Sequence, residues 1–304
     1  MKDTQQLSRL ASEQSNTASC ALDQKNAYEI ASIINGDDAK VAGAVQRALP
    51  QIAEAIDLIA EAIGNGGRLI YVGAGTSGRI AALDASECPP TFNTDPKTVQ
   101  FVMAGGPKAL ASAAEGNEDS PRLGEREIAK KKPGKKDVVV GIAASGRTPF
   151  TVAALACARK RGAKTVAVTC NQNSPLAAAA DVAIVTEVGA EVVAGSSRMK
   201  AGTAQKMVLN MLSTGATVRM GYVYGNLMVN VHLKNEKLVE RGISILQQAA
   251  DVDRKTAEQA LKAAGNTVPV ALVMLRAKVS RSGAEKALRS AKRNVREAIR
   301  LAAR

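Results

Sequence analysis

Residues 68–90 read RLIYVGAGTSGRIAALDASECPP, and this stretch decides the fold of the chain. Four apolar or β-prone residues, Leu69–Val72, run into the glycine-rich stretch 73–79, and an apolar helical pattern follows. This order predicts a buried parallel strand, a tight turn and the start of a helix. Glycines let backbone N–H groups approach an anion, and a helix N-terminus adds unpaired donors and partial positive charge. The turn is therefore predicted to bind a phosphate group through Thr76, Ser77, Gly78 and Arg79.

The same letters also spell G-x-G-x-x-G, the pattern of dinucleotide-binding turns. Such a site expects an acidic residue at the end of the next strand, where it holds the ribose hydroxyls. The next predicted strand, Val99–Met103, is followed by Ala104-Gly105-Gly106 and by no carboxylate. A phosphate loop for a smaller ligand is therefore favoured over a dinucleotide site and over a plain strand-to-helix turn.

The composition predicts a soluble protein with an aliphatic core. At 304 residues and 46% hydrophobic content, the chain can form a core domain plus an appendage. It has no Trp, four Tyr and three Phe, so Ala, Val, Leu and Ile must fill that core. Its apolar runs are too short to span a bilayer, and MKDTQQLSRL contains no apolar export segment. We expect a cytoplasmic protein that does not contact a membrane.

Cysteine and histidine usage argues against a metal site. The four cysteines form no C-x-x-C pair and have no neighbouring histidines, so free structural thiols in a reducing compartment are favoured. They are Cys20, Cys88, Cys157 and Cys170. The single histidine, His232, lies in MVNVHLKNE, which indicates a packed segment rather than a catalytic relay or a metal centre.

The net charge of +13 raises the question of nucleic acid. The basic residues concentrate in the linker 130–136 and in the last fifty residues, aromatic residues for base stacking are almost absent, and no DNA-reading motif occurs. A solvated basic surface is therefore favoured over a nucleic-acid face. Its charge would still steer an anionic substrate toward the site.

Strand and helix patterns alternate through the middle of the chain, which predicts a parallel sheet covered on both faces. The predicted strands are Leu69–Val72, Val99–Met103, Val138–Ala143, Thr165–Thr169 and Val182–Thr186. The predicted helices between them are Gly78–Ala85, Pro107–Ala114, Arg122–Lys131, Pro149–Arg161 and Leu176–Ala180. The site of such a sheet lies beyond the carboxyl ends of its strands, where the strand order reverses.

Helices are expected on both sides of this region. Residues 1–50 form an N-terminal helical segment broken near residues 35–38, and residues 51–222 form the sheet domain. The C-terminal region, residues 223–304, is predicted to contain helices near 236–249, 254–264, 268–277 and 282–301, the last three forming a small bundle. No site chemistry is expected there.

A second turn repeats the chemistry of the first. The strand that begins at Val138 leads into Ser145, Gly146, Arg147 and Thr148, and Pro149 suits the first turn of the helix that follows. Two Ser/Thr-Gly-Arg turns, each at the carboxyl end of a strand, are predicted to converge on one phosphate or one sugar.

A third polar segment precedes a long helix predicted over Met199–Val218. Its residues Glu191, Ser196, Ser197 and Lys200 are further candidates for contact with the substrate. Capping of the helix is the alternative explanation for Ser197.

The two Ser-rich turns resemble those of the sugar isomerase (SIS) phosphosugar-binding domain. The stretches LDASECPPT, EGNEDS, GIAASGRTP and GAEVVAGSSRMKAGTAQKMVLNMLSTG, with GNLMVNV and NEKL, resemble the N-acetylmuramic acid 6-phosphate etherase family over most of the chain. This resemblance implies a three-layer, flavodoxin-like α/β fold with N-terminal helices and a C-terminal helical bundle. It also implies a homodimer with the sugar site near the subunit interface, no cofactor and no metal.

The resemblance further implies cleavage of the lactyl ether of N-acetylmuramic acid 6-phosphate during cell-wall sugar recycling. Its two key carboxylates correspond to Glu87 in DASECPP and Glu118 in EGNED. Glu87 is then the acid that assists lactate departure, and Glu118 is the better candidate for the base at C2. The alternatives are an ion pair of Glu87 with Arg79 or Arg68, a solvated acidic loop around Glu118, and Glu115 in place of Glu118.

Two other functions fit the same fold. An aldose–ketose isomerase would interconvert sugar phosphates without releasing lactate. A non-catalytic sugar-phosphate sensor would bind without turnover, and residues 1–50 lack the helix-turn-helix pattern of a sensor that acts on DNA.

Overall fold

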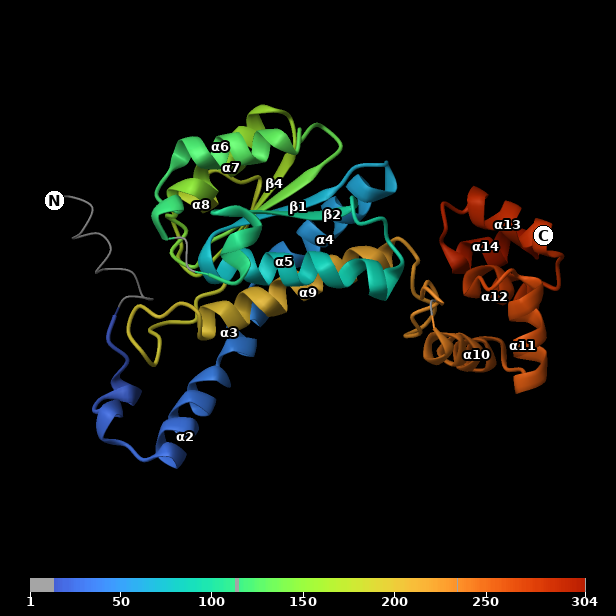
Figure 1. The fold of residues 1–304 in the computed structure, drawn as a ribbon, viewed down its shortest axis with the longest axis horizontal. Coiled ribbons are helices and arrows are strands. Elements are labelled where there is room, and N and C mark those ends of the chain that lie inside the picture. The colour runs from blue at the N-terminus through green and yellow to red at the C-terminus, as the bar shows by residue number, and fades with distance from the viewer. Residues whose placement is uncertain (1–13, 113–114, 234, 304) are drawn as a thin grey trace. The chain divides into compact units, whose positions relative to one another are not determined.

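The computed structural model describes residues 14–112, 115–233 and 235–303, and its elements are labelled in Figure 1. It divides into two compact units. The first contains the chain up to Ala85 together with Lys97–Ser213, and the second contains Ser86–Pro96 and the chain from Thr214 onward. The helices before residue 50 therefore share a unit with the sheet. Along the described parts of the chain, no helix is long and apolar enough to cross a membrane.

The first unit is built on a five-stranded parallel sheet with the order β2-β1-β3-β4-β5. The prediction of a flavodoxin-like sheet is confirmed, and each predicted strand is present with ends that differ by no more than one residue. The strands are β1 (Leu69–Gly73), β2 (Val99–Met103), β3 (Val138–Ile142), β4 (Lys164–Thr169) and β5 (Val182–Val185).

Helices cover both faces of this sheet, as Figure 1 shows. On one face, α7 (Pro149–Lys160) packs against β1, β3 and β4, with α6 (Pro121–Lys130) and α8 (Pro175–Ala178) beside it. A Cβ atom at Gly124 of α6 would lie 2.1 Å from the Phe150 carbonyl oxygen, so only glycine permits this close approach of α6 and α7. On the other face, α4 (Leu49–Gly64) packs against β1, β3 and β5.

Two longer helices, α5 (Gly75–Phe92) and α9 (Lys200–Arg219), also belong to the α4 face. Tyr71 of β1 donates a hydrogen bond of 2.8 Å to Asp84 of α5, and Ser213 of α9 donates to the other carboxylate oxygen of Asp84 at 3.0 Å. This buried carboxylate joins the sheet to both helices. Each helix continues from the first unit into the second.

The course of α5 differs from the prediction at both ends. It begins at Gly75 rather than Gly78, and it continues past the predicted end at Ala85 through Pro89 and Pro90 to Phe92. A helix can retain its course past a proline while losing the hydrogen bond that the missing N–H would make. The helix ends at Phe92. Asn93, the next residue, has a left-handed φ of 52°, and its N–H donates to the Pro89 carbonyl oxygen at 2.9 Å.

The helices that flank the strands agree with the predictions only in part. The predicted break near residues 35–38 is present, because α2 (Ala27–Asp38) ends at Asp38 and α3 (Val41–Arg47) begins three residues later. Short 3-10 helices precede α2 at Thr17–Ser19 and Leu22–Gln24. The helix predicted over 107–114 is a 3-10 helix over Gly106–Leu110, with residues 113–114 outside the described residues, and a 3-10 turn follows at Glu115–Asn117.

The second unit has one hydrophobic core that includes residues of five C-terminal helices. They are α10 (Glu236–Ala250), α11 (Arg254–Ala263), α12 (Val268–Ala277), α13 (Arg281–Ser290) and α14 (Val295–Ala302). The predicted single helix over 282–301 is wrong, because Lys292 and Arg293 adopt positive φ angles of 49° and 70° and Asn294 caps α14. The core also extends beyond the predicted three-helix bundle.

Candidate active site

The two Ser/Thr-Gly-Arg turns follow neighbouring strands at the reversal of strand order. In the order β2-β1-β3-β4-β5 the chain reverses between β1 and β3, and these strands pair in parallel. Gly73 and Ile142, the last residues of the two strands, are register partners. Adjacent strands lie about 4.8 Å apart, so the turns begin side by side where ligands of such sheets bind.

The first turn presents backbone and hydroxyl donors together. Because α5 begins at Gly75, Thr76 and Ser77 lie in its first turn, where N–H groups have no partner within the helix. Neither hydroxyl makes a hydrogen bond to any part of the chain that the structure describes. The Gly78 N–H donates to the Ala74 carbonyl oxygen at 3.1 Å. A Cβ at Gly78 would lie 2.8 Å from Met103 Cγ, so this glycine serves close packing of helix and sheet.

Arg79 is directed toward the segment that follows β2. Its Nε donates to the Leu110 carbonyl oxygen at 3.1 Å, and its terminal nitrogen Nη2 donates to the Ser112 carbonyl oxygen at 3.0 Å. The guanidinium group therefore fixes the chain a few residues before Glu118. A direct contact of Arg79 with phosphate remains a prediction.

The second turn is shaped by a glycine with left-handed backbone. Gly146 has φ of 66°, and a Cβ there would lie 2.3 Å from Ser174 Oγ and 2.7 Å from Thr169 Oγ1. Ser145 Oγ accepts a hydrogen bond from the Arg147 N–H at 3.2 Å. Thr148 precedes α7 but makes no capping hydrogen bond with its side chain. Its half-buried hydroxyl therefore keeps its capacity to bind a ligand.

Glu118 lies between the two turns. Its carbonyl oxygen accepts a hydrogen bond of 3.0 Å from the Phe150 N–H, in the first turn of α7. Its carboxylate Oε1 lies 3.0 Å from the position that a Cβ at Gly75 would occupy, at the first residue of α5. The half-buried side chain thus reaches from the second turn to the first. Any larger residue at position 75 would displace this carboxylate.

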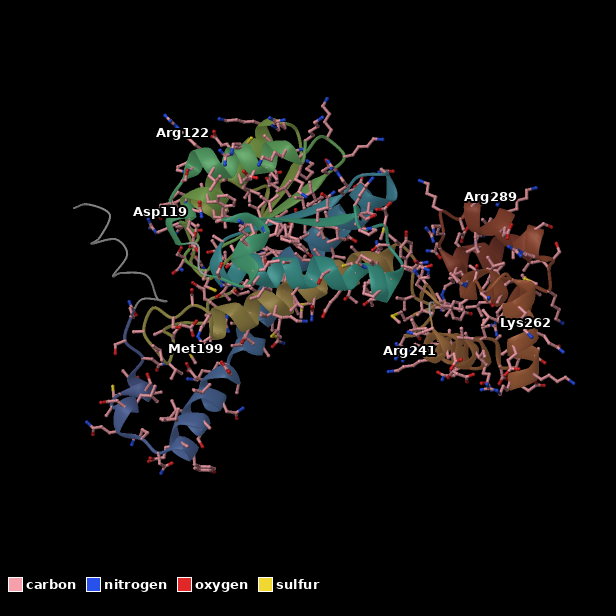
Figure 2. All side chains as sticks on the ribbon, in the orientation of Figure 1. Asp119, Arg122, Met199, Arg241, Lys262 and Arg289 are labelled. Carbon is pink, nitrogen blue, oxygen red and sulfur yellow. The ribbon has the colours of Figure 1, made fainter. Side chains whose placement is uncertain are left out.

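The two acidic residues near Glu118, Asp119 and Glu115, are not placed between the turns by the structure. Asp119 is exposed at the surface, and Figure 2 labels it close to Arg122 at the start of α6. Glu115 is the alternative to Glu118 as the second key carboxylate, and its side chain lies outside the part of the chain that the structure describes.

Glu87 stands on the part of α5 that belongs to the second unit, about three helical turns after Ser77. Its side chain is exposed. The alternative of an ion pair with Arg68 does not form, because Arg68 binds Asp137 at 2.8 Å. Arg79, the other proposed partner, binds the carbonyl groups described above. Glu87 is thus available to a ligand or to another chain.

The third segment packs against the first turn. A Cβ at Gly202 of α9 would lie 3.5 Å from Thr76 Cγ2, so the first turns of α5 and α9 are in contact. Met199, labelled in Figure 2, marks the start of α9. The predicted alternative role of Ser197 as helix cap is wrong, since the Glu191 carboxylate accepts the N–H groups of Lys200 and Ala201, each at 3.0 Å. Ser196 and Ser197 are half-buried.

Lys200 and Glu191 are buried and bound within the protein. Lys200 Nζ lies 2.6 Å from Asp37 Oδ2 and donates to the Ala190 carbonyl oxygen at 2.5 Å. Burial raises the pKa of Glu191, and its two backbone donors offset this only in part. Burial would also raise the pKa of Asp37, but hydrogen bonds from Lys200 and Lys40 outweigh it and lower that pKa.

The remaining titratable candidates lie elsewhere. His232 is exposed rather than packed, and it lines a cavity of about 560 Å³ within the second unit together with Asn266 and Arg289. All four cysteines are free thiols, as predicted. Among the residues that the structure describes, no three His, Cys, Asp or Glu side chains are grouped to hold a metal ion.

Comparison with known proteins identifies the class. A family model for the N-terminal SIS domain of the glucokinase regulatory protein matches residues 51–159, and a model for the SIS domain matches residues 131–215. The sheet order and these matches define an SIS-domain protein of the phosphosugar-binding type.

Curated relatives identify one family within this class of SIS-domain proteins. A protein from Symbiobacterium thermophilum named N-acetylmuramic acid 6-phosphate etherase is 56% identical over 275 residues, which are 90% of this chain and 91% of that protein. A protein of the same name from Photobacterium profundum is 50% identical over 293 residues, 96% of this chain and 97% of its own. The chain belongs to the N-acetylmuramic acid 6-phosphate etherase family.

Proposed function

We propose that this chain is a lyase that cleaves the D-lactyl ether of N-acetylmuramic acid 6-phosphate at the switch point between β1 and β3. The reaction eliminates lactate and adds water, giving N-acetylglucosamine 6-phosphate and D-lactate. The position of Glu118 carries the proposal, because its carbonyl oxygen accepts the Phe150 N–H directly after the second turn and its carboxylate lies beside Gly75 of the first turn. The etherase relatives support the same reaction.

The phosphate is held by the two turns. Thr76 and Ser77 offer hydroxyls beside the N-terminus of α5, whose partial positive charge favours an anion. Thr148 offers the corresponding hydroxyl in the second turn, at the start of α7, and Ser145, Gly146 and Arg147 complete that turn. Anchoring of the 6-phosphate at these turns leaves the sugar carbons to extend toward the Glu118 carboxylate.

The chemistry needs one base and one acid. In the ring-opened sugar, the C1 aldehyde acidifies the C2 proton, which Glu118 removes as a carboxylate. The C3 ether oxygen leaves as lactate when Glu87 protonates it, and Glu87 then activates the water that adds to the unsaturated aldehyde. No metal or organic cofactor takes part in this scheme.

We further propose that the active form is a cytoplasmic homodimer with the sugar site near the subunit interface. Glu87 is exposed on α5, and the large apolar side chain of Leu83, one turn earlier, is 43% exposed. Both side chains are therefore accessible to a second copy of the chain.

Lactate release from N-acetylmuramic acid 6-phosphate by the purified protein tests this function. Incubation in labelled water adds a second readout, because reversible removal of the C2 proton introduces the label at that carbon. Lactate together with C2 label is the expected result. Interconversion of sugar phosphates without lactate would indicate an isomerase, and binding without turnover would indicate a sensor; either result would contradict the proposal.

A further inference from the structure

A buried network of charges lies behind the third polar segment. Asp37 at the end of α2 and Lys200 at the start of α9 are 2% and 3% exposed, and their charged atoms are 2.6 Å apart. Lys200 also donates to the Ala190 carbonyl oxygen at 2.5 Å. Asn16 Nδ2 donates to the same carbonyl oxygen at 3.1 Å and to Asp37 Oδ2 at 2.9 Å. The network therefore fixes the chain at Ala190, within the segment that joins β5 to α9.

Glu191, the residue after Ala190, fixes the end of this segment that meets α9. It is fully buried, and its two carboxylate oxygens accept the first N–H groups of α9, those of Lys200 and Ala201. A carboxylate at a helix N-terminus satisfies orphan donors and complements the helix dipole. Residues 190–191 and 200–201 are thereby joined, and the chain between them forms a closed loop.

The closed loop is a wall of the proposed phosphosugar site. It contains Ser196 and Ser197, and α9 begins directly after it with Gly202 packed against Thr76 of the first turn. Between its fixed ends, Val193, Ala194 and Gly195 are exposed and have no regular structure. The position of the two serines relative to Thr76 thus depends on the anchors at the base of the loop.

We propose that Asp37, Lys200 and Glu191 are positioning residues, which hold the loop 192–199 against the first turn of α5 without touching the substrate. This inference rests on the proposed function for the identity of the site. It replaces direct substrate contact as the role of Lys200 and Glu191, since the polar atoms of both side chains are engaged within the protein. Loss of Lys200 removes the buried partner of Asp37 and leaves only Asn16 and the exposed Lys40 bound to it, so the loop base should open in that variant.

The variant Lys200→Met tests this role, and the chain provides a matched control. Arg68 and Asp137 also form a largely buried ion pair, 2.8 Å long, but at the amino ends of β1 and β3. Arg68→Met should therefore lower stability without affecting the site. The double variant Asp37→Asn with Lys200→Met removes both buried charges and covers the case in which the single variant fails to fold.

Two measurements separate positioning from general destabilisation. Hydrogen exchange should show faster exchange of the amides of residues 192–199 in Lys200→Met and in the double variant, but not in Arg68→Met. For lactate release, KM should rise between about tenfold and a hundredfold in the Lys200 variants while kcat changes less than about threefold, because misplacement of binding groups weakens substrate capture. KM should not change in Arg68→Met.

Unchanged exchange of residues 192–199 in the Lys200 variants would overturn the inference, and so would a fall in kcat at constant KM, which would place Lys200 at the reacting atoms. If the unmodified protein releases no lactate, the proposed function fails. The exchange comparison then still decides whether these charges hold the loop.

Discussion

At the amino ends of the strands, the side chains of Asp137 and Asp181 are bonded within the protein, whereas at the carboxyl ends the hydroxyls of Thr76, Ser77 and Thr148 make no hydrogen bond to the residues that the structure describes. Asp137 accepts hydrogen bonds from the backbone and side chain of Arg68 and from the Gly134 N–H. Asp181 accepts the N–H and hydroxyl of Thr165 and pairs with Arg159. The sheet thus has internally bonded carboxylates at the amino ends of its strands, here called the amino edge. At the carboxyl ends, the carboxyl edge, these three hydroxyls are available to a ligand.

The contrast shows how a parallel sheet separates stability from function. Polar groups with internal partners stabilise the native state and offer little to a ligand. Donors without internal partners stabilise it less, but they bind an anion without first breaking other contacts. The amino edge therefore supplies controls for experiments on phosphate binding at the carboxyl edge.

The largest expected effect is the loss of lactate release in Glu87→Ala. Because general acid catalysis contributes typically 10²- to 10⁴-fold and Glu87 acts in two steps, we expect a fall of at least about a thousandfold. The fold should persist since the side chain is exposed. Lactate assay and circular dichroism measure the two properties, with Glu125→Ala on the surface of α6 as control. Near-normal lactate release would refute the assignment.

Glu118→Gln should reduce both lactate release and C2 labelling by roughly 10²- to 10⁴-fold, because an amide keeps the shape of the carboxylate but is not a base. Mass spectrometry of the recovered sugar phosphate measures the label. Asp119→Asn, on the exposed neighbour, should retain both activities. Labelling at the normal rate in Glu118→Gln would transfer the role of base to another group.

Ser77→Ala should weaken substrate binding at the carboxyl edge. Loss of one hydroxyl to a charged phosphate costs about 1.5–3 kcal/mol, which corresponds to a rise in KM of about ten- to a hundredfold. Thr165→Val is the matched control, since its hydroxyl is bound to Asp181 at the amino edge. That variant should lower the melting temperature and leave KM unchanged. An equal rise in KM for both variants would remove the distinction between the edges.

Asp137→Asn should lower the free energy of unfolding by about 1–3 kcal/mol, because Arg68 loses its charged partner. Denaturant unfolding measures this loss, and KM should remain normal. A changed KM would show that the amino edge contributes to the site.

The smallest expected effect is a dependence on pH of the stabilisation that the Asp137–Arg68 ion pair provides. Burial alone would raise the pKa of Asp137, but hydrogen bonds from Arg68 and Gly134 outweigh it and lower the pKa. A lowered pKa in the folded state stabilises the protein above the unfolded pKa of about 3.9, and this contribution is lost as pH falls through the folded value. The stability difference between the unmodified protein and Asp137→Asn should therefore shrink below about pH 4. A stability difference that stays constant below pH 4 would contradict a lowered pKa of Asp137 in the folded state.

Local patterns in the sequence predicted most of this architecture. The apolar strands and the glycine turns after β1 and β3 were found because their signals lie within a few residues. The break between α13 and α14 was missed because Lys292 and Arg293, rather than glycine or proline, adopt the left-handed angles.

The site was predictable only in part, for a similar reason. The hydroxyl turns are local features, whereas the contact between Glu118 and Gly75 depends on the tertiary fold. Capping of α9 was the alternative explanation for the nearby Ser197, but Glu191, six residues earlier in the chain, caps the helix. Hydrogen-bond partners that come from outside an element leave no periodic signal in it.

The two prolines inside α5 have a consequence for the turn that carries Glu87. Their rings replace the N–H groups that would bond to the carbonyls of Ala85 and Ser86, so this turn is held by fixed φ angles instead of a hydrogen-bond ladder. Alanine at these positions would restore the ladder and make the helix more resistant to heat. It would also remove the fixed φ angles that hold the backbone next to Glu87. The melting temperature would therefore rise while the rate of proton transfer by Glu87 would fall.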